Sequence, residues 1–268
     1  MEGRVLVVAG SDSGGGAGIQ ADIKTITMLG GFAATAVTAL TAQNTRGVHG
    51  VVAVDPAFVA RQIEVVLDDL GADCIKTGML HSAEVIEAVA RTLERRARGV
   101  PLVVDPVMVA KGGAPLLAQA AEVTLRLRLL PMAALLTPNA PEAEALSGLP
   151  VRQIADLRPA ADAFMALGVG AVLIKGGHLP GDVVVDLLRT ADGEEHVFED
   201  TRIASRHTHG TGCTLASAIA AGIAQGLRLS DAVARARDYV RQAIRSAPGF
   251  GAGNGPLDHA HPLTPSDN

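Results

Sequence analysis

Short apolar runs alternate with amphipathic segments along almost the whole chain. The first run, residues 4–10 (RVLVVAG), is rich in β-branched side chains and predicts a buried strand. After a glycine-rich loop, the apolar residues of one predicted helical face recur at helical spacing: Ile19, Ile23, Ile26 and Leu29. The chain is therefore predicted to open with a strand, a loop and a helix.

The same alternation continues to the end of the chain. Further strands are predicted at residues 33–43, 51–54, 73–80, 101–105, 133–139 and 171–177. Helices are predicted at residues 57–70, 82–97, 114–130, 140–148 and 157–168, and from about 213 and 230. Strands and helices that alternate at this spacing indicate an α/β fold with a mostly parallel sheet and helices on both faces.

Residues 181–190 and 196–200 break this alternation. Two strand patterns follow each other there, joined by the turn sequence ADGEE. They predict an antiparallel hairpin at the edge of the sheet. Because no linker of disordered composition interrupts the order, we expect a single domain over residues 1–268.

Composition narrows the classes of partner. Hydrophobic residues make up 48% of the 268 residues, which is enough for a large core. The formal net charge is -5, without a basic tract or an aromatic stripe, so nucleic acid is not an expected partner. The most apolar helical run, residues 213–227, is shorter than the roughly 20 residues that span a bilayer, so no membrane partner is expected.

Cysteine usage and the N-terminus indicate the compartment. Cys74 and Cys213 provide neither a disulfide framework nor a zinc spacing. The first residues lack the basic start and the long apolar run of a signal peptide. We therefore expect a cytoplasmic protein.

Glycine and polar residues gather where the predicted strands end. In open parallel sheets, ligands bind beyond the carboxyl ends of the strands. The residues at these ends are the glycine-rich loop 10–18, Gln43 with Asn44, Gly78 with Met79, Asp105, Asn139 with Glu142, and Lys175 with two glycines. This edge of the sheet is the predicted ligand site.

The glycine-rich loop GSDSGGGAGIQAD, residues 10–22, is compatible with a phosphate cradle. It lacks the Gly-Lys-Ser/Thr ending of a P-loop. Gly16, Gly18 and Ala21 fit a loose dinucleotide-binding spacing, but no acidic residue ends a second strand to hold a ribose. A Rossmann oxidoreductase is therefore disfavoured.

Asn139 and Glu142 lie three residues apart in TPNAPEA, so both side chains can face one site. A carboxylate and an amide suit a hydrated magnesium ion, which needs few protein ligands. The same spacing fits an ordinary capping box, with Asn139 as N-cap, and the pattern alone leaves both interpretations open. Asp105 is a second candidate for the metal or its waters, and Lys175 is placed to reach a polyphosphate.

The segment HTHGTGCTLA, residues 207–216, places Cys213 directly after Gly-Thr-Gly at a predicted helix start. The positive field of a helix N-terminus favours an anion, and it also favours a thiolate over a thiol. His207 and His209 lie two residues apart without further metal-type ligands in the segment, so a zinc site is disfavoured.

Several of these segments together resemble one family. The motifs are GSDSGGGAGIQADIKT, TALTAQNTRGV, KTGML, VVDPVMVAKGG, LLPMAALLTPNAPEAEAL, LIKGGH, HTHGTGCTLASAIAA and GNGPLDH, in order over nearly the whole chain. The chain resembles the hydroxymethylpyrimidine/phosphomethylpyrimidine kinases, thiamine-pathway members of the ribokinase-like superfamily. The resemblance implies a three-layer α/β/α sandwich that uses ATP and Mg²⁺ to phosphorylate a pyrimidine alcohol and then its monophosphate. A homodimer is the family expectation.

The resemblance also implies roles for individual residues. The backbone of Gly210, Thr211, Gly212 and Cys213 would stabilise the transferring phosphoryl group, and Cys213, with a lowered pKa, would accept the proton of the substrate hydroxymethyl group. Gln43 would read the aminopyrimidine ring. The remaining implied positions are Gly10, Asp22, Met79 and Val107 for the substrate, Lys175, Asn139 and Thr208 for the nucleotide, and Glu142 with Asp105 for the metal.

Two other functions are weighed against this one. A pyridoxal kinase of the same superfamily also acts on a flat ring that bears a hydroxymethyl group, but Gln43 within AQNTRGV favours the pyrimidine. A non-catalytic ligand-binding regulator is opposed by the complete set of kinase residues. The segment RIASRHTHG, residues 202–210, departs from the relatives, which often carry Lys or Asn before Thr-His-Gly.

Overall fold

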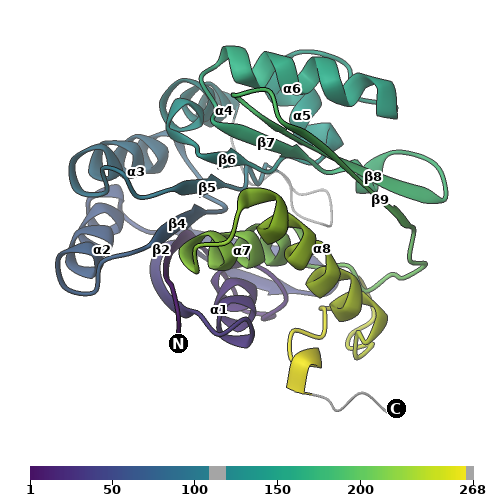
Figure 1. The fold of residues 1–268 in the computed structure, drawn as a ribbon. Helices are drawn as coiled ribbons and strands as arrows, with labels where there is room; N and C mark the ends of the chain where they lie inside the picture. The colour runs from purple at the N-terminus through teal and green to yellow at the C-terminus, as the bar shows by residue number, and fades with distance from the viewer. Residues whose placement is uncertain (109–118, 264–268) are drawn as a thin grey trace.

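A computed structural model describes residues 1–108 and 119–263 of the chain. Its strands form one nine-stranded sheet in the order β3-β2-β1-β4-β5-β6-β7-β8-β9 (Figure 1). The strands are β1 (Arg4–Asp12), β2 (Phe32–Asn44), β3 (Gly47–Ala53), β4 (Cys74–Thr77), β5 (Leu102–Val104), β6 (Leu135–Leu136), β7 (Ala171–Ile174), β8 (Val183–Thr190) and β9 (Glu195–Thr201). The predicted α/β class is confirmed.

The sheet is parallel in its centre and antiparallel at both edges. Strands β2, β1, β4, β5, β6 and β7 pair in parallel. The pair β8 and β9 is antiparallel, which confirms the predicted edge hairpin, and β3 adds a second antiparallel edge against β2. The edge at β3 was not predicted, because the apolar pattern of a strand does not tell its direction.

Helices cover both faces of the sheet (Figure 1). They are α1 (Gly18–Met28), α2 (Pro56–Asp69), α3 (Ala83–Arg96), α4 (Gln119–Thr124), α5 (Ala140–Ser147), α6 (Leu157–Ala166), α7 (Thr211–Ala224) and α8 (Leu229–Arg245). A π-helical turn, Leu125–Leu129, follows α4. The helix predicted at residues 114–130 therefore exists in its second half, and its first residues lie outside the described part of the chain.

Alternate side chains of the central strands supply two separate cores. Val5 and Val7 of β1 pack with α1, α7 and α8, whereas Leu6 and Val8 pack with helices α2 to α6. This division follows from the alternation of side chains along a strand, and it explains why β1 is apolar throughout. The two cores hold the strand ends rigidly at one edge of the sheet.

Helix α1 departs from the predicted apolar face. Ile23 is 38% exposed, whereas Asp22 and Thr25 are fully buried with Ile26. The helix packs through small and polar residues because Asp22 finds two buried partners, Lys76 of β4 and Ser217 of α7. The predicted face is therefore confirmed at Ile19, Ile26 and Leu29, which pack in or against the core, and wrong at Ile23, since periodicity cannot show a buried ion pair.

Candidate active site

A cavity of about 780 Å³ opens at the carboxyl ends of the parallel strands. It is bounded by the glycine-rich loop after β1, the ends of β2, β4, β5 and β7, and the N-terminus of α7. The predicted site residues that line it are Gly10, Gln43, Met79, Asp105, Val107, Asn139, Glu142, Lys175, Thr208, Gly210, Thr211, Gly212 and Cys213. Segments that are far apart in sequence thus form one site.

Asp22 is the predicted site residue that the structure places elsewhere. It is fully buried and does not line the cavity. Its Oδ1 atom lies 2.9 Å from Lys76 Nζ and accepts a hydrogen bond of 2.7 Å from Ser217 Oγ. Ser217 follows Cys213 by one helical turn, so this ion pair lies behind the cavity wall, and Asp22 does not form part of the pocket lining as expected.

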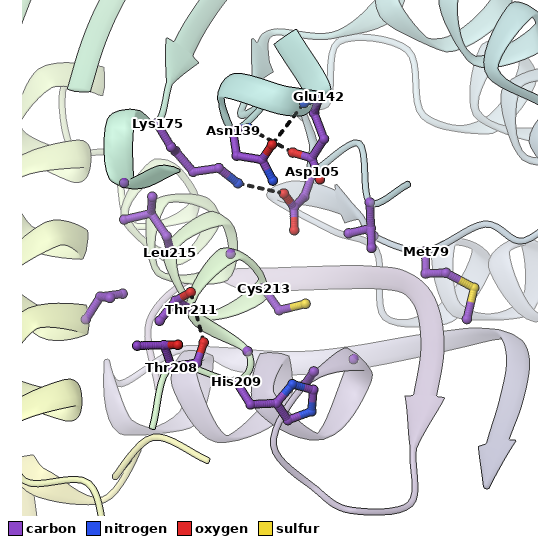
Figure 2. Close-up of a pocket in the computed structure, with 18 of the residues that line it drawn as sticks. Met79, Asp105, Asn139, Glu142, Lys175, Thr208, His209, Thr211, Cys213 and Leu215 are labelled. Atoms are coloured by element: carbon purple, nitrogen blue, oxygen red, sulfur yellow. Dashed lines mark hydrogen bonds and ion pairs between the residues drawn. The ribbon is translucent and has the colours of Figure 1, made fainter. Parts of the chain in front are cut away.

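One end of the cavity, called the charged end below, carries Lys175, Asp105 and Glu142. Lys175 Nζ at the end of β7 lies 3.2 Å from Asp105 Oδ1 after β5 (Figure 2). Burial lowers the pKa of Lys175, but Asp105 and Glu142 raise it more, so the side chain stays a cation. Asp105 Oδ2 is buried and has no hydrogen-bond partner among the described residues.

Asn139 and Glu142 form the capping box that the sequence left open. The Glu142 N–H donates to Asn139 Oδ1 at 2.9 Å, and the Asn139 N–H donates to Glu142 Oε2 at 2.8 Å. The box does not make Glu142 an ordinary surface cap, because burial raises the pKa of Glu142 to about 7, with Lys175 lowering and Asp105 raising it. A carboxylate held in this way gains from an added cation.

The charged end fits a magnesium ion that has few protein ligands. Among the described residues, no group of three or more His, Cys, Asp or Glu side chains is arranged to hold a metal. The unpartnered Asp105 Oδ2 and the buried carboxyl of Glu142 instead offer oxygen atoms of the kind that Mg²⁺ accepts beside waters and phosphates.

The N-terminus of α7 faces the charged end. Gly210 precedes the helix with φ +86°, and a Cβ there would lie 1.8 Å from the Gly16 carbonyl oxygen. Among the described residues no side chain caps this helix start, although the Thr211 N–H donates to the Thr208 carbonyl oxygen at 3.4 Å, so the turn leaves room for an anion beside its backbone. A Cβ on Gly212 would lie 3.4 Å from Lys175 Nζ, which shows how close the turn comes to the lysine.

Cys213 lines the same cavity but does not have the lowered pKa that the sequence predicted. Burial raises the pKa of its thiol to about 12, although the Lys76 ammonium and the Gly18 backbone N–H both lower it. Desolvation of the thiolate therefore outweighs the field of the helix start. Burial thus favours a thiol over the expected thiolate at Cys213, and the role of Cys213 as proton acceptor stays a prediction.

The opposite end of the cavity is polar but well hydrogen-bonded. Gln43 at the end of β2 lies between Thr41 and His209, and His209 Nε2 lies 3.0 Å from Asp12 Oδ2. Met79 lies at this end, within 2.4 Å of the position that a Cβ on Gly10 would take. A side chain at position 10 would require the end of the Met79 side chain to move.

Comparison with known proteins identifies the family. The family model of phosphomethylpyrimidine kinase matches residues 12–258. A hydroxymethylpyrimidine/phosphomethylpyrimidine kinase of Streptomyces coelicolor is 51% identical over 259 residues, which are 97% of this chain and 95% of that protein. The chain belongs to the phosphomethylpyrimidine kinase family. It is a kinase and hence a phosphotransferase.

Two further similarities are consistent with this family assignment. A thiamine biosynthesis bifunctional protein of Geobacter sulfurreducens is 54% identical over 96% of this chain, which spans about half (52%) of that protein. Among solved structures, an ADP complex of Bacillus subtilis pyridoxal kinase covers 98% of this chain and is itself fully covered, with a TM-score of 0.89 and 33% identity. The phosphomethylpyrimidine kinase family thus shares its ribokinase-like fold with pyridoxal kinases, as predicted.

Sequence reasoning missed several polar residues that line or back this cavity, and four of them take part in the contacts described here. Asp12, Thr41 and His209 line the cavity, and Lys76 is fully buried behind it. Two signals were available: an acidic residue inside a glycine-rich loop, and one of the chain's four lysines within an apolar strand. Neither signal reveals its partner, because the partners are distant in sequence.

Proposed function

We propose that this kinase phosphorylates 4-amino-5-hydroxymethyl-2-methylpyrimidine with ATP, and then its monophosphate to the pyrophosphate, at the cavity described above. The family and its curated relatives confirm the predicted activity of a hydroxymethylpyrimidine/phosphomethylpyrimidine kinase in thiamine biosynthesis. The observation that carries the residue assignment is the convergence of the α7 N-terminus, the pair of Lys175 and Asp105, and Gln43 on one cavity.

The charged end would bind the nucleotide phosphates. Lys175 would contact the transferring phosphoryl group, and the backbone N–H groups of Gly210 to Cys213 would surround it, because both are fixed positive groups beside one space. Asn139 and Thr208 would border the nucleotide. Asp105 and Glu142 would hold Mg²⁺, which neutralises phosphate charge when bound.

Cys213 would accept the proton of the hydroxymethyl group. Because the thiol rests protonated, the base form is a minor population near neutral pH. Positioning by Gln43 at one end and electrostatic stabilisation by the α7 turn at the other would therefore contribute most of the acceleration. Gly10, Met79 and Val107 would enclose the ring.

Pyridoxal is the second candidate substrate. The TM-score of 0.89 to a pyridoxal kinase supports it, but identity is 33% there and 51% to the pyrimidine kinase of Streptomyces coelicolor. The pyrimidine is therefore preferred. The predicted single domain, homodimer and cytoplasmic location stay predictions; among the described residues, no helix has the length and hydropathy needed to cross a membrane.

A direct assay tests the proposal. The purified protein is incubated with magnesium and ATP and, separately, with the pyrimidine alcohol, its monophosphate and pyridoxal, and phosphorylated products are quantified. We expect product from both pyrimidines and the highest kcat/KM for the pyrimidine alcohol. Product from pyridoxal alone would contradict the proposed substrate.

A further inference from the structure

The amide of Gln43 belongs to a continuous chain of polar contacts at the end of the cavity that contains Gln43, Met79 and His209. We call this region the ring-binding end. As placed, the amide has Oε1 toward Thr41 and Nε2 toward His209: Thr41 Oγ1 lies 3.1 Å from Gln43 Oε1 and 2.9 Å from the Ser11 carbonyl oxygen. The other end of the amide lies 3.3 Å from His209 Nε2, which is also 3.0 Å from Asp12 Oδ2. The two ends of a carboxamide have the same shape, so the hydrogen bonds decide which is oxygen.

The Thr41 hydroxyl fixes one end. It has a single hydrogen atom, and the Ser11 carbonyl oxygen, which can only accept, receives it. Towards Gln43 the Thr41 oxygen can therefore only accept a hydrogen bond. The Gln43 atom that faces Thr41 must be the NH₂ group.

Asp12 and His209 fix the other end independently. Burial raises the pKa of Asp12, but His209 and the backbone N–H groups of Ala17 and Gly14 lower it more, so the carboxyl is ionised and only accepts. His209 Nε2 must therefore carry a hydrogen and donate it. A protonated Nε2 has no lone pair with which to accept from an NH₂ group, so the Gln43 atom facing it is the carbonyl oxygen, which shares the hydrogen that Asp12 receives.

Close packing keeps the His209 ring in this position. His209 is 8% exposed, and a Cβ on Gly16 would lie 2.5 Å from its Cδ2 atom. Asp12 is 3% exposed and also accepts hydrogen bonds from the N–H groups of Gly14, Gly16 and Ala17. The His209 ring therefore packs against the glycine-rich loop, and the hydrogen bonds to Asp12 stabilise this loop.

We infer that Asp12 and His209 lock the Gln43 amide in one orientation, with its oxygen toward His209 and its NH₂ toward Thr41, and that His209 is thereby a specificity-determining positioning residue. The outer edge of a carboxamide presents a lone pair and an N–H side by side. In the locked order this edge accepts from an exocyclic amino group and donates to the adjacent ring nitrogen. The inference rests on the proposed function. The locked amide favours aminopyrimidines over rings in which the hydrogen-bond donor and acceptor are exchanged.

An oxo analogue makes the order measurable. In 5-hydroxymethyl-2-methylpyrimidin-4-one the amino group is replaced by a carbonyl and the adjacent nitrogen carries hydrogen, so donor and acceptor are exchanged. A locked amide leaves both groups of this ring unpaired, whereas a freely rotating amide pairs with either ring. The ratio of kcat/KM for the amino alcohol to that for the oxo alcohol reports the lock.

The experiment compares this ratio in wild-type protein and three variants. His209→Leu removes the donor, and we expect the ratio to fall by about tenfold or more, because the freed amide accommodates both rings. His209→Gln keeps an N–H near the position of Nε2 and should retain the ratio within about threefold. His196→Leu, which alters a histidine of the edge strand β9, should leave rates and ratio unchanged. The KM for ATP should not change in any of them.

The outcomes separate the lock from a structural role and from the substrate assignment. If His209→Leu slows both alcohols by the same factor, the ratio is unchanged and the inference is overturned. If that variant does not fold, Thr41→Val removes the acceptor at the other end of the amide, and an unchanged ratio there overturns the inference equally. If wild-type protein phosphorylates neither alcohol, the proposed function fails and the inference falls with it.

Discussion

The two ends of the cavity differ in how completely their polar groups are paired. At the ring-binding end, Asp12 accepts hydrogen bonds from three backbone N–H groups and from His209, and Gln43 has a partner on each side. At the charged end, Asp105 Oδ2 has no partner among the described residues, and burial raises the pKa of Glu142 to about 7.

This difference corresponds to the difference between the two substrates. A neutral ring is recognised by a few hydrogen bonds, so its site gains from groups that are already oriented. A polyphosphate and its metal bring several charges, so a site for them gains from an unpartnered carboxylate oxygen such as Asp105 Oδ2 and from a buried carboxyl such as that of Glu142. We therefore expect the paired end to provide selectivity, and the charged end to provide binding of charge and catalysis.

The charged end should show the largest effect. Lys175→Met removes the cation beside the α7 turn, and we expect kcat to fall by about 10²–10³, the usual cost of losing one group that stabilises the transition state. Steady-state kinetics at saturating pyrimidine alcohol measure it. Arg61→Met removes an exposed cation of α2 and serves as the matched control. A loss below about threefold in Lys175→Met would exclude a catalytic role of Lys175.

Glu142→Gln tests whether the capping residue also serves the metal. The amide can keep the cap, but it loses the charge, so the Mg²⁺ concentration for half-maximal turnover should rise by about tenfold. Magnesium titrations of initial rates measure this shift. An unchanged magnesium requirement would leave Glu142 as a helix cap only.

The same variant has a predicted effect on stability, with a defined sign. The folded-state pKa of Glu142 is raised to about 7, so wild-type protein without magnesium loses stability as pH rises from the unfolded value of about 4.3 to the folded one. Glutamine does not titrate. The difference in Tm, variant minus wild type, should therefore become more positive between about pH 5 and about pH 8. Thermal unfolding across this range measures it, and a constant difference would show that Glu142 does not titrate there.

Gln43→Leu should have a smaller and more selective effect. It leaves the ring amino group and ring nitrogen unpaired, so the KM of the pyrimidine alcohol should rise by about 5–100-fold while the KM of ATP stays the same. The ATP titration in the same assay is the internal control. Equal increases in both constants would remove Gln43 from ring recognition.

The strand ends were predictable from sequence, but their pairing was not. Apolar runs located β1, β4, β5 and β7, and the rule that ligands bind at carboxyl ends placed Asp105 and Lys175 in one site. The partner of Asp22 could not be found in this way, since Lys76 is 54 residues away and Ser217 is 195 residues away. Only the packed fold shows that Asp22 supports the site from behind.

The helix start at Cys213 shows the same limit for electrostatics. Gly-Thr-Gly correctly located the start of α7, where we propose that the phosphoryl group binds. The thiol pKa depends on how much water the surrounding chain removes, and this burial comes from segments that are remote in sequence. A local motif therefore predicts where a charge is favoured, but not whether desolvation outweighs that preference.

The central claim is that Cys213 rests as a thiol with a raised pKa and that its minor thiolate form accepts the substrate proton. The most direct test is the pH dependence of kcat for wild-type protein and Cys213→Ser between about pH 6 and about pH 9, in single turnovers with saturating substrates. For wild-type protein we expect a rate that keeps rising to the upper limit without a plateau, and for Cys213→Ser a rate about 10²–10⁴-fold lower. A wild-type plateau below about pH 8 would show a resting thiolate, and a serine variant within about tenfold of wild type with the same profile would show that the thiol is not the proton acceptor.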